Sequence, residues 1–482
     1  MTSRSCTLAF AAWVGVALAG CARFQPEPLS PALNATALDN RTLDDARLHR
    51  FLLASLPPGQ EPAGAPRWNL DTLTLAALYY HPDLAVADAK LAGTQADILT
   101  ARQRPNPSLN FAGNYATMAV AGGFPPAALP LTIGPAVNFL IETFGKREDR
   151  TEQARHLADA ARADIATAAW QVRGRVRTAL LNLWAGQQRL TLAQRQVTLR
   201  QQLVGLLEQR LGAGFATALD VTRERIALAQ ATLGVRDVTR LQADALVQLA
   251  TALGVPVRAL DGVRLSTDAF DHPVMPGQDV ADGPLRRQAL TERTDVQASL
   301  AQYEATQATL RLQVANQYPN VTLSPGYNYD LGINRFILNP TFDLPIFNQN
   351  QGPIARALAD RQLAAANFSA LQSQVIGAVD AAAAAYRNAT LGLRTADALL
   401  SDERVRQRQA QASFKAGESD RPTLVAAELE AAVIQSSRFD ALVLQLQALG
   451  ALEDALEQPL FDPEAARFVP HADPLTVTEP HA

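Results

Sequence analysis

Two long stretches without proline constrain the fold of this chain more than any other sequence feature. No proline occurs from Ala136 to Val255 or from Ile354 to Arg421, and the second stretch spans 68 residues. Apolar residues recur at steps of three and four, as in Val172, Val176 and Leu180, which is typical of an amphipathic helix. A helix of about 68 residues would be about 100 Å long. Because such helices cannot fold back into a compact ball, they predict a rod or a tube.

The chain also repeats its own pattern at a distance of 203 residues. The matching positions are aromatic, glycine and proline residues: Phe139 and Phe342, Phe144 and Phe347, Gly214 and Gly417, Pro256 and Pro459. Further towards the N-terminus the spacing is wider, at 214 for the Pro-Asn pairs that begin at Pro105 and Pro319. Self-similarity in a constant order indicates two copies of one structural unit.

Each copy contains two segments in which apolar and polar residues alternate. Strands are therefore expected at about 107–116 and 131–142 in the first copy, and at about 320–330 and 335–344 in the second. Alternation over about ten residues with intervening turns is the weak signature of a membrane barrel strand. Four strands cannot close a barrel, and an open sheet edge in lipid costs several kcal/mol for each unsatisfied backbone group. Several chains must therefore share one barrel. The polar segment 348–352 is expected to be the point where a lipid-embedded strand continues as a helix in water.

The N-terminus indicates export and anchoring. Arg4 precedes a short apolar stretch that ends in Leu18-Ala19-Gly20-Cys21, as in a secretory signal peptide. The small residues before Cys21 resemble the bacterial lipobox, whose cysteine is lipidated and becomes the first residue of the mature chain. Ala22, rather than an aspartate, favours the outer membrane of a Gram-negative bacterium over the inner membrane. The alternative is an ordinary signal peptide followed by a chance cysteine.

At this point the sequence resembles the TolC family of outer-membrane efflux ducts, over roughly 70–459. The resemblance rests on the order of the elements and on motifs at both ends of the helices. "RPNP" at 104–107, "IETFGKREDR" at 141–150 and "FDLPIFNQNQG" at 342–352 look like family motifs at the strands, and 210–221 and 413–425 look like the two helical hairpin tips. The finer resemblance is to lipid-anchored ducts of cobalt–zinc–cadmium and copper–silver efflux systems. Those often have Gly-Gly-Lys-Arg where this chain has Phe144-Gly145-Lys146-Arg147.

The resemblance implies a mainly α-helical homotrimer with a membrane β-barrel. Each chain would give four strands to a shared barrel of 12 and its helices to a long periplasmic tube. The implied partners are a periplasmic membrane-fusion adaptor, an inner-membrane pump of the RND type and outer-membrane lipid. The expected segments are a signal peptide (1–20), a lipid-anchored segment (21–69), a first repeat (70–256), a linker (257–283), a second repeat (284–459) and an irregular tail (460–482).

The candidate functional residues lie at the hairpin tips. Gly214 and Gly417 are expected to be left-handed turn residues, and the resemblance places adaptor contacts at them and at Phe215 and Glu418, which follow them. Carboxylates near the tips are Asp220, Glu418 and Asp420. They fit two interpretations: helix N-caps, or a charged ring at the pore aperture.

Nothing in the sequence indicates catalysis or a cofactor other than the covalent lipid on Cys21. The six histidines are isolated, and 43 basic against 47 acidic side chains do not predict a nucleic-acid surface. Metal ligation by this chain is therefore not expected. The leading hypothesis is a non-enzymatic exit duct for cargo delivered by a pump, with heavy-metal cations as one cargo and drugs or other organic compounds as the alternative. A structural coiled-coil lipoprotein without a pore is the rival hypothesis.

Overall fold

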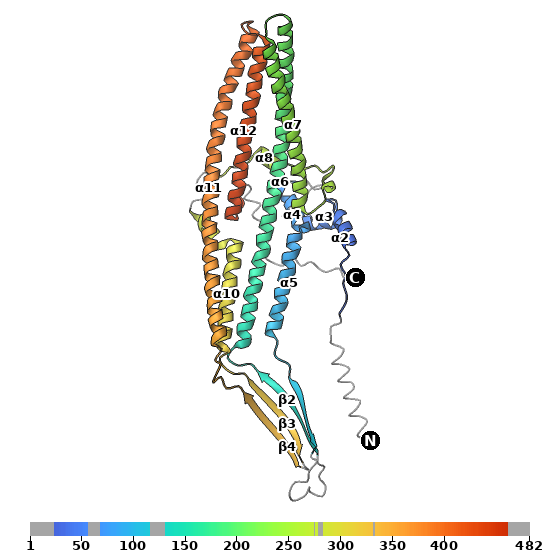
Figure 1. Cartoon of the computed structure of the whole chain (residues 1–482), viewed down its shortest axis with the longest axis vertical. Helices are drawn as coiled ribbons and strands as arrows, with labels where there is room; N and C mark the ends of the chain where they lie inside the picture. Colours follow the sequence, from blue (N-terminus) through green and yellow to red (C-terminus); the bar gives the residue numbers. More distant parts are fainter. Residues whose placement is uncertain are drawn as a thin grey trace.

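The computed structural model describes residues 24–55, 68–115, 131–273, 275–277, 283–330 and 333–460. The described chain is a long rod of helices with a sheet at one end (Figure 1). The expected signal peptide, Cys21, the loop 116–130 and the tail after 460 lie outside the described residues.

Four helices make up most of the rod. They are α6 (Lys146–Gly212), α7 (Ala218–Leu253), α11 (Gln351–Lys415) and α12 (Arg421–Leu456). At a rise of about 1.5 Å per residue, the 67 residues of α6 span about 100 Å. α6 with α7 and α11 with α12 form two helical hairpins that turn at the end of the rod opposite the sheet (Figure 1). α7 and α12 begin 203 residues apart and end 203 residues apart.

Two shorter helices continue the rod towards the sheet. α5 (Pro82–Arg102) follows the end of α7 in space, and α10 (Thr294–Ala315) follows the end of α12, while α6 and α11 run past both junctions (Figure 1). The remaining helices gather near the middle of the rod: α2 (Pro31–Asp39), α3 (Ala46–Ser55), α4 (Leu70–Tyr80), the 3-10 helix η1 (Val257–Leu260), α8 (Asp268–Asp271) and α9 (Pro284–Glu292). None of the helices that the structure describes is both long and apolar enough to cross a membrane.

The sheet has four antiparallel strands in the order β1-β2-β3-β4. They are β1 (Ser108–Tyr115), β2 (Leu131–Ile141), β3 (Val321–Asp330) and β4 (Ile333–Phe342), within two residues of the expected ranges at each end. β2 and β3, which come from different halves of the chain, pair in the centre, for example Phe139 with Leu323. The fold class expected from the sequence, mainly helical with four strands per chain, is confirmed.

The second strand-to-helix transition differs slightly from the expectation. α11 begins at Gln351, inside the polar segment 348–352, so Gln351 and Gly352 belong to its first turn and only 343–350 connect the strand to the helix. Asn350 precedes the helix with a φ of 63°, in the left-handed region, which asparagine tolerates better than most residues. The polar segment is therefore a helix start as well as a connection.

The largest apolar core lies at the middle of the rod. It joins α3 and α4 to the long helices through buried residues such as Leu48, Leu73, Leu180, Leu249 and Leu449. Trp184 on α6 anchors this core: its ring packs on Phe270 and Phe439, and its N–H donates to Asp271 at 2.9 Å. The core therefore fixes where the two helical hairpins meet the rest of the chain.

Candidate functional site

The first hairpin tip is built around Gly214. Gly214 has a φ of 77°, a conformation that glycine adopts without a steric penalty. Thr217, not Asp220, is the N-cap of α7, and Asp220 completes the capping box by accepting from the backbone N–H of Thr217 at 3.1 Å. Hydrogen bonds from the side chain and the backbone of Thr217 lower the pKa of Asp220. The N-cap interpretation is therefore wrong for Asp220 itself, although the residue does stabilise the helix start.

The second tip repeats the turn and adds a link to the first. Gly417 has a φ of 76°, and Asp420 is the N-cap of α12, accepting from the Thr423 backbone N–H at 2.9 Å. Arg210 near the end of α6 approaches the Asp420 carboxylate at 2.6 Å. The hydrogen bonds from Thr423, followed by the charge of Arg210, lower the pKa of Asp420. The N-cap interpretation thus holds for Asp420, which also ties the two hairpins together.

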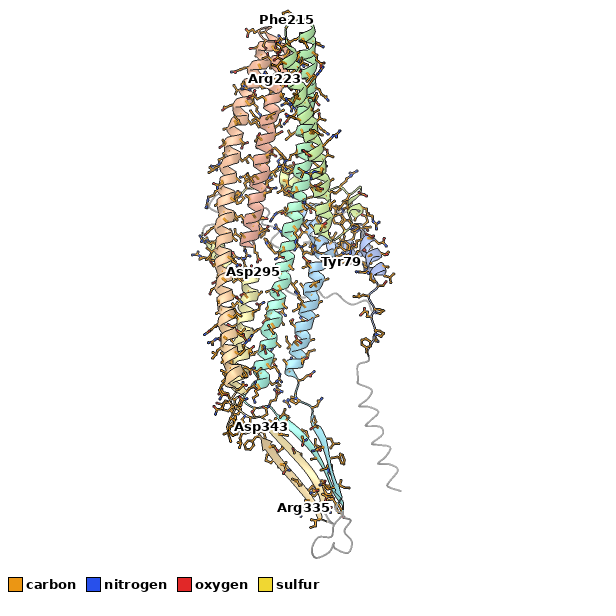
Figure 2. The ribbon with its side chains drawn as sticks, in the orientation of Figure 1. Tyr79, Phe215, Arg223, Asp295, Arg335 and Asp343 are labelled. Atoms are coloured by element: carbon orange, nitrogen blue, oxygen red, sulfur yellow. The ribbon has the colours of Figure 1, made fainter. Side chains whose placement is uncertain are left out.

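The tip residues expected to contact an adaptor come together at one end of the rod. Phe215 is 79% exposed at the extreme end (Figure 2), and Gly214, Gly417 and Glu418 are also exposed. Glu418 caps no helix, since its backbone N–H donates to Ser413 and the N-cap role belongs to Asp420. An exposed aromatic ring beside two tight turns is available to a partner.

A second group of specific contacts lies where the strands meet the helices. Lys146 at the start of α6 donates to the Tyr318 carbonyl at 2.6 Å and to the Asn320 side chain at 2.7 Å. Burial lowers the pKa of this lysine. Phe144, with a φ of 60°, stacks on Tyr318 with 4.1 Å between ring centroids. The "TFGK" part of the first junction motif therefore joins the two halves of the chain at the end of the sheet.

At the middle of the rod, α6 and α12 are joined by buried charges that the sequence analysis missed. Arg177 donates to Glu453 at 2.5 Å and to Asp454 at 2.6 Å, and Arg173 lies 3.4 Å from Glu453. Glu453 is fully buried. A sequence signal did exist: arginines four residues apart lie beside Val172 and Val176, and charged residues on an apolar helix face usually need a partner.

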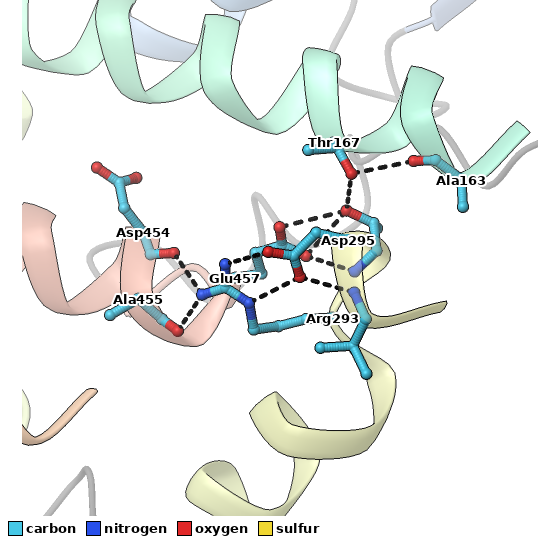
Figure 3. Close-up of polar contacts among 9 residues, drawn as sticks. Ala163, Thr167, Arg293, Asp295, Asp454, Ala455 and Glu457 are labelled. Carbon is cyan, nitrogen blue, oxygen red and sulfur yellow. Dashed lines mark hydrogen bonds and ion pairs between the residues drawn. The ribbon is translucent and has the colours of Figure 1, made fainter. Parts of the chain in front are cut away.

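The junction of α12 with α10 lies beside these charges (Figure 3). Glu457, just beyond α12, accepts from the backbone N–H of Thr294 at 2.7 Å and so caps α10. Burial raises the pKa of Glu457. Arg293 is paired with Asp295 at 2.7 Å and donates to the Ala455 carbonyl at 2.5 Å. The end of one helix is thus bound to the start of the next.

A cavity of about 690 Å³ opens between these groups. Its walls come from α6, the end of α7, the start of α5 and the α12–α10 junction, and include His81, Trp170, Arg175, Asp454 and Glu457. The described residues contain no group of three or more histidine, cysteine or acidic side chains arranged to hold a metal ion.

Comparisons with known proteins give one family match over part of the chain. Residues 74–255 match the model of the outer membrane efflux protein family. The chain is 25% identical over 278 residues to the cobalt-zinc-cadmium resistance protein CzcC of Cupriavidus metallidurans, covering 57% of this chain and 62% of the relative. It is 27% identical over 322 residues to the pyoverdine export outer membrane protein OpmQ of Pseudomonas aeruginosa, covering 62% and 65%. The matched region therefore spans less than two thirds of either relative.

Solved structures agree with this match at the level of the fold. The outer-membrane channel OprN superposes with a TM-score of 0.66 at 21% identity, covering 80% of this chain and 89% of that one. The sequence match to the family model and the likeness in fold agree with the resemblance to the TolC family that the sequence shows. Over residues 74–255, less than half of its length, the chain is similar to the outer membrane efflux proteins, and its fold is similar to that of OprN.

Proposed function

We propose that this chain is the outer-membrane channel of a tripartite efflux system. Three copies would form a passive exit duct, which receives cargo from an inner-membrane pump through a periplasmic adaptor. The observation that carries the proposal is a four-stranded sheet with two free edges at the end of a rod of about 100 Å. The match of residues 74–255 to the outer membrane efflux protein family supports it.

The sheet needs partners in a membrane. Within the described residues, β1 and β4 each pair along one edge only. The strands expose large apolar side chains, including Phe111, Phe336 and Leu338. In lipid, an unpaired edge would leave backbone groups unsatisfied at a cost of several kcal/mol each. Three chains of four strands supply 3 × 4 = 12 strands, and pairing β1 of one copy with β4 of the next closes the barrel.

The helical part carries a matching unpartnered seam. Leu219, Ile226, Leu233 and Val247 on α7 are all about half exposed, and their spacings are seven, seven and fourteen residues. Apolar residues at every seventh position form one stripe along a helix that packs in a coiled coil. α7 and α11 are the outer helices of the four that approach the tip (Figure 1). A neighbouring copy that covers α7 with its own α11 would bury this stripe and close a tube.

The tip supports the adaptor role. Phe215 and Glu418 are exposed beside the two turns, and Phe215 lies at the end farthest from the sheet (Figure 2). If the sheet lies in the outer membrane, this end reaches about 100 Å into the periplasm. Exposed aromatic rings are frequent anchors at protein interfaces. We assign the adaptor contact to these turns.

We also propose the lipid anchor on Cys21. α2 begins at Pro31, and it lies beside the rod near the start of α5 (Figure 1). The 21 residues of α5 span about 31 Å towards the sheet. Ten residues from Cys21 to Ser30 reach at most about 36 Å when extended, which is long enough for a lipid on Cys21 to enter the same membrane. Mass spectrometry of the mature chain tests this: an unmodified terminus away from Cys21 would exclude the anchor.

The cargo has two candidates. One relative is named for cobalt-zinc-cadmium resistance, which favours heavy-metal cations, and the other for pyoverdine export, which favours organic compounds. A passive duct would leave the choice of cargo to the pump. Deleting the gene and measuring the growth inhibition caused by zinc, cobalt and cadmium against a panel of organic toxins discriminates the two: only the transported class becomes more toxic.

The channel itself is tested by reconstitution. We expect the purified protein to have the mass of a trimer in detergent and to conduct ions across a planar lipid bilayer once the tips are open. Because Arg210–Asp420 joins the tips, Arg210→Ala would serve as an opened variant. A stable trimer that never conducts, even with this substitution, would support the structural rod instead. A protein that stays monomeric in every detergent would contradict the shared barrel.

A further inference from the structure

The register of the sheet separates an apolar face from a polar one. Partners across a strand pair lie on the same face, and neighbours along a strand lie on opposite faces. One face therefore holds the odd-numbered residues of 109–113, 133–141 and 321–329 and the even-numbered residues of 334–342. These residues include Phe111, Phe139, Leu323 and Phe336, and none of them is charged. We call this the apolar face, and it is the one that fits lipid.

Exposed aromatic side chains mark the level at which the sheet ends and the helices begin. The stacked rings of Phe144 and Tyr318 are both exposed, and so is Phe347 in the connection from β4 to α11. Aromatic side chains are enriched where a membrane protein passes from hydrocarbon into water. If the apolar face lies in lipid, the residues around Phe144 lie at the level of the lipid headgroups.

A cavity of about 460 Å³ opens at this level. The end of β2, which includes Phe139 and Ile141 of the apolar face, contributes one side of it. Arg104 and Pro105, in the connection from α5 to β1, and residues 145–148 at the start of α6 contribute the other side. The cavity thus joins an apolar wall from the sheet to a charged wall from the helix start. A phospholipid has the same order, with acyl chains beside a charged headgroup.

The charged groups of the cavity leave a positive surplus. The lining contains three basic and two acidic side chains: Arg104, Lys146 and Arg147, and Glu142 and Glu148. Glu142 is already paired with Arg150, outside the lining, at 2.8 Å. Glu148 is therefore the carboxylate that remains against the three basic groups, and this balance favours an anion.

Two of the basic groups are accessible to a ligand. Arg104 is exposed, and no carboxylate of the described residues lies within ion-pair distance of it. The side chain of Arg147 is about one third exposed, and its contact with Glu148 is 3.7 Å long, beyond hydrogen-bond distance. Lys146 is buried and donates to Tyr318 and Asn320 instead. Guanidinium groups bind phosphate oxygens in pairs, so two accessible arginines suit a phosphate.

We propose that this cavity binds the phosphate of an anionic membrane phospholipid. Arg104 and Arg147 donate to the phosphate oxygens, and the acyl chains lie against Phe139 and Ile141. A free phosphate ion would use the arginines but would leave the apolar wall unoccupied, which favours a lipid. The inference rests on the proposed function, because the cavity lies at headgroup level only if the sheet is in the outer membrane.

Three ligands that share a phosphate test the proposal. Purified full-length protein in detergent is titrated with dioleoyl phosphatidylglycerol, dioleoyl phosphatidylcholine and glycerol 3-phosphate, and bound molecules are counted by native mass spectrometry. We expect phosphatidylglycerol to bind one site per chain, at least about fivefold more tightly than phosphatidylcholine, because basic groups favour a lipid with a net negative charge. Glycerol 3-phosphate, which has no acyl chains, should bind more weakly. Equal affinity for the two lipids, or glycerol 3-phosphate binding as tightly as phosphatidylglycerol, would overturn the proposal.

Variants separate the site from the overall charge of the protein. Arg104→Gln should weaken binding of phosphatidylglycerol about fivefold, and Glu148→Gln should strengthen it, because it removes the opposing carboxylate. Arg223→Gln is the matched control: it removes an exposed arginine that is not in an ion pair of the described residues and lies near the tips, far from the sheet (Figure 2). If Arg223→Gln weakens binding as much as Arg104→Gln, the effect is overall charge and the site is wrong.

The bilayer recordings distinguish this inference from the proposed function. Arg104 precedes β1 and has no part in the strand pairing, so Arg104→Gln should conduct like the wild type while losing its preference for phosphatidylglycerol. A wild type that conducts but binds both lipids equally would contradict the lipid site alone. A wild type that never enters the bilayer would contradict the channel and the lipid site together.

Discussion

The two halves of the molecule end their tip-forming helices in the same backbone turn but stabilise it differently. α7 is followed by Gly254 and α12 by Glu457, which lie 203 residues apart, and both residues have left-handed backbones, with φ of 72° and 50°. Each turn sits where a second helix begins, α5 in the first half and α10 in the second (Figure 1). Both turns therefore need a left-handed backbone, but one has a glycine there and the other a glutamate.

In the first half no side chain fits at the turn. A Cβ on Gly254 would lie 2.9 Å from the Tyr80 carbonyl oxygen, closer than such atoms approach. The stabilising group comes from far away in the sequence: Arg41 donates to the carbonyls of Tyr80 and Gly254 at 2.8 Å each. α5 starts with Pro82, which has no N–H to cap.

In the second half the turn has room for a side chain, and the Glu457 carboxylate forms a hydrogen bond there. Glu457 accepts from the backbone N–H of Thr294, which occupies the helix start where the first half has Pro82. Arg293, a direct neighbour, donates to the Ala455 carbonyl, as Arg41 does for its own junction. The comparison teaches that a left-handed position specifies glycine only where the surrounding backbone leaves no room. Where space exists, a carboxylate can offset the strain by capping the next helix.

The largest expected effect concerns the charges found in only one half. Glu453 is fully buried between Arg173 and Arg177, whereas the position 203 residues earlier is the buried Ala250. Glu453→Gln should destabilise the protein by about 3–5 kcal/mol, because it leaves buried arginines without their full countercharge. Thermal unfolding followed by circular dichroism measures this.

The matched control for Glu453→Gln is a surface pair. Asp380 pairs with Arg286 and is about half exposed. Asp380→Asn should lower the free energy of unfolding by less than about 1 kcal/mol. Equal losses in the two variants would mean that the buried cluster contributes no more than a surface pair.

The next effect separates the two turns directly. Gly254→Ala should cost about 2–3 kcal/mol, because it adds a contact with the Tyr80 carbonyl to the penalty for a left-handed backbone. Glu457→Gly should change the free energy of unfolding by less than about 1 kcal/mol, since relief of strain at φ 50° offsets the lost cap. The unfolding midpoints of the two variants show whether Gly254→Ala is the more destabilising substitution. The comparison would fail if Glu457→Gly were the more destabilising of the two.

A smaller effect distinguishes the two tips. Asp420→Ala removes the N-cap of α12 and the ion pair with Arg210, and should cost about 1 kcal/mol. Asp220→Ala should cost less, because Thr217 remains as the N-cap of α7. Thermal unfolding of both variants measures which of the two loses more stability.

The pore interpretation of the tip carboxylates has its own test. Glu418→Gln combined with Asp420→Asn keeps a capping side chain at position 420 and removes two charges. If these residues line an aperture in the trimer, their symmetry mates lie within a Debye length, about 8 Å at physiological salt. The double variant should then lower cation selectivity and divalent block in bilayer recordings. Unchanged selectivity would leave Asp420 as a cap alone.

The smallest effect is a pH dependence at the second turn, where Glu457 takes the place of Gly254. Burial raises the pKa of Glu457 above its unfolded value, so the folded state binds this proton more tightly. The resulting stability is present below the unfolded pKa and is lost as pH rises through the folded pKa. Lowering the pH from 7 towards 5 should therefore raise the melting temperature of the wild type more than that of Glu457→Gln. Parallel curves for the two proteins would show that Glu457 does not titrate in this window.

Several features followed from the sequence alone because they depend on local chemistry. Long stretches without proline predicted the long helices, since proline is the residue that helix interiors exclude most strongly. Alternation predicted the four strands within two residues at each end. Gly214 and Gly417 were predicted as left-handed turn residues, and both have positive φ, because a helical hairpin with so short a turn needs one there.

Only the tertiary structure decided the contacts between distant segments. Arg41 reaches Gly254 across 213 residues, and Arg177 reaches Glu453 across 276. A periodic pattern shows that a helix has a buried face, but it does not show which helix covers that face or which charge meets another there. The cavity between the two junctions was equally invisible, because its walls come from four helices and from residues between helices that lie far apart in the sequence. Such a site depends on the relative position of helices, which the packing of the core sets and the local sequence does not.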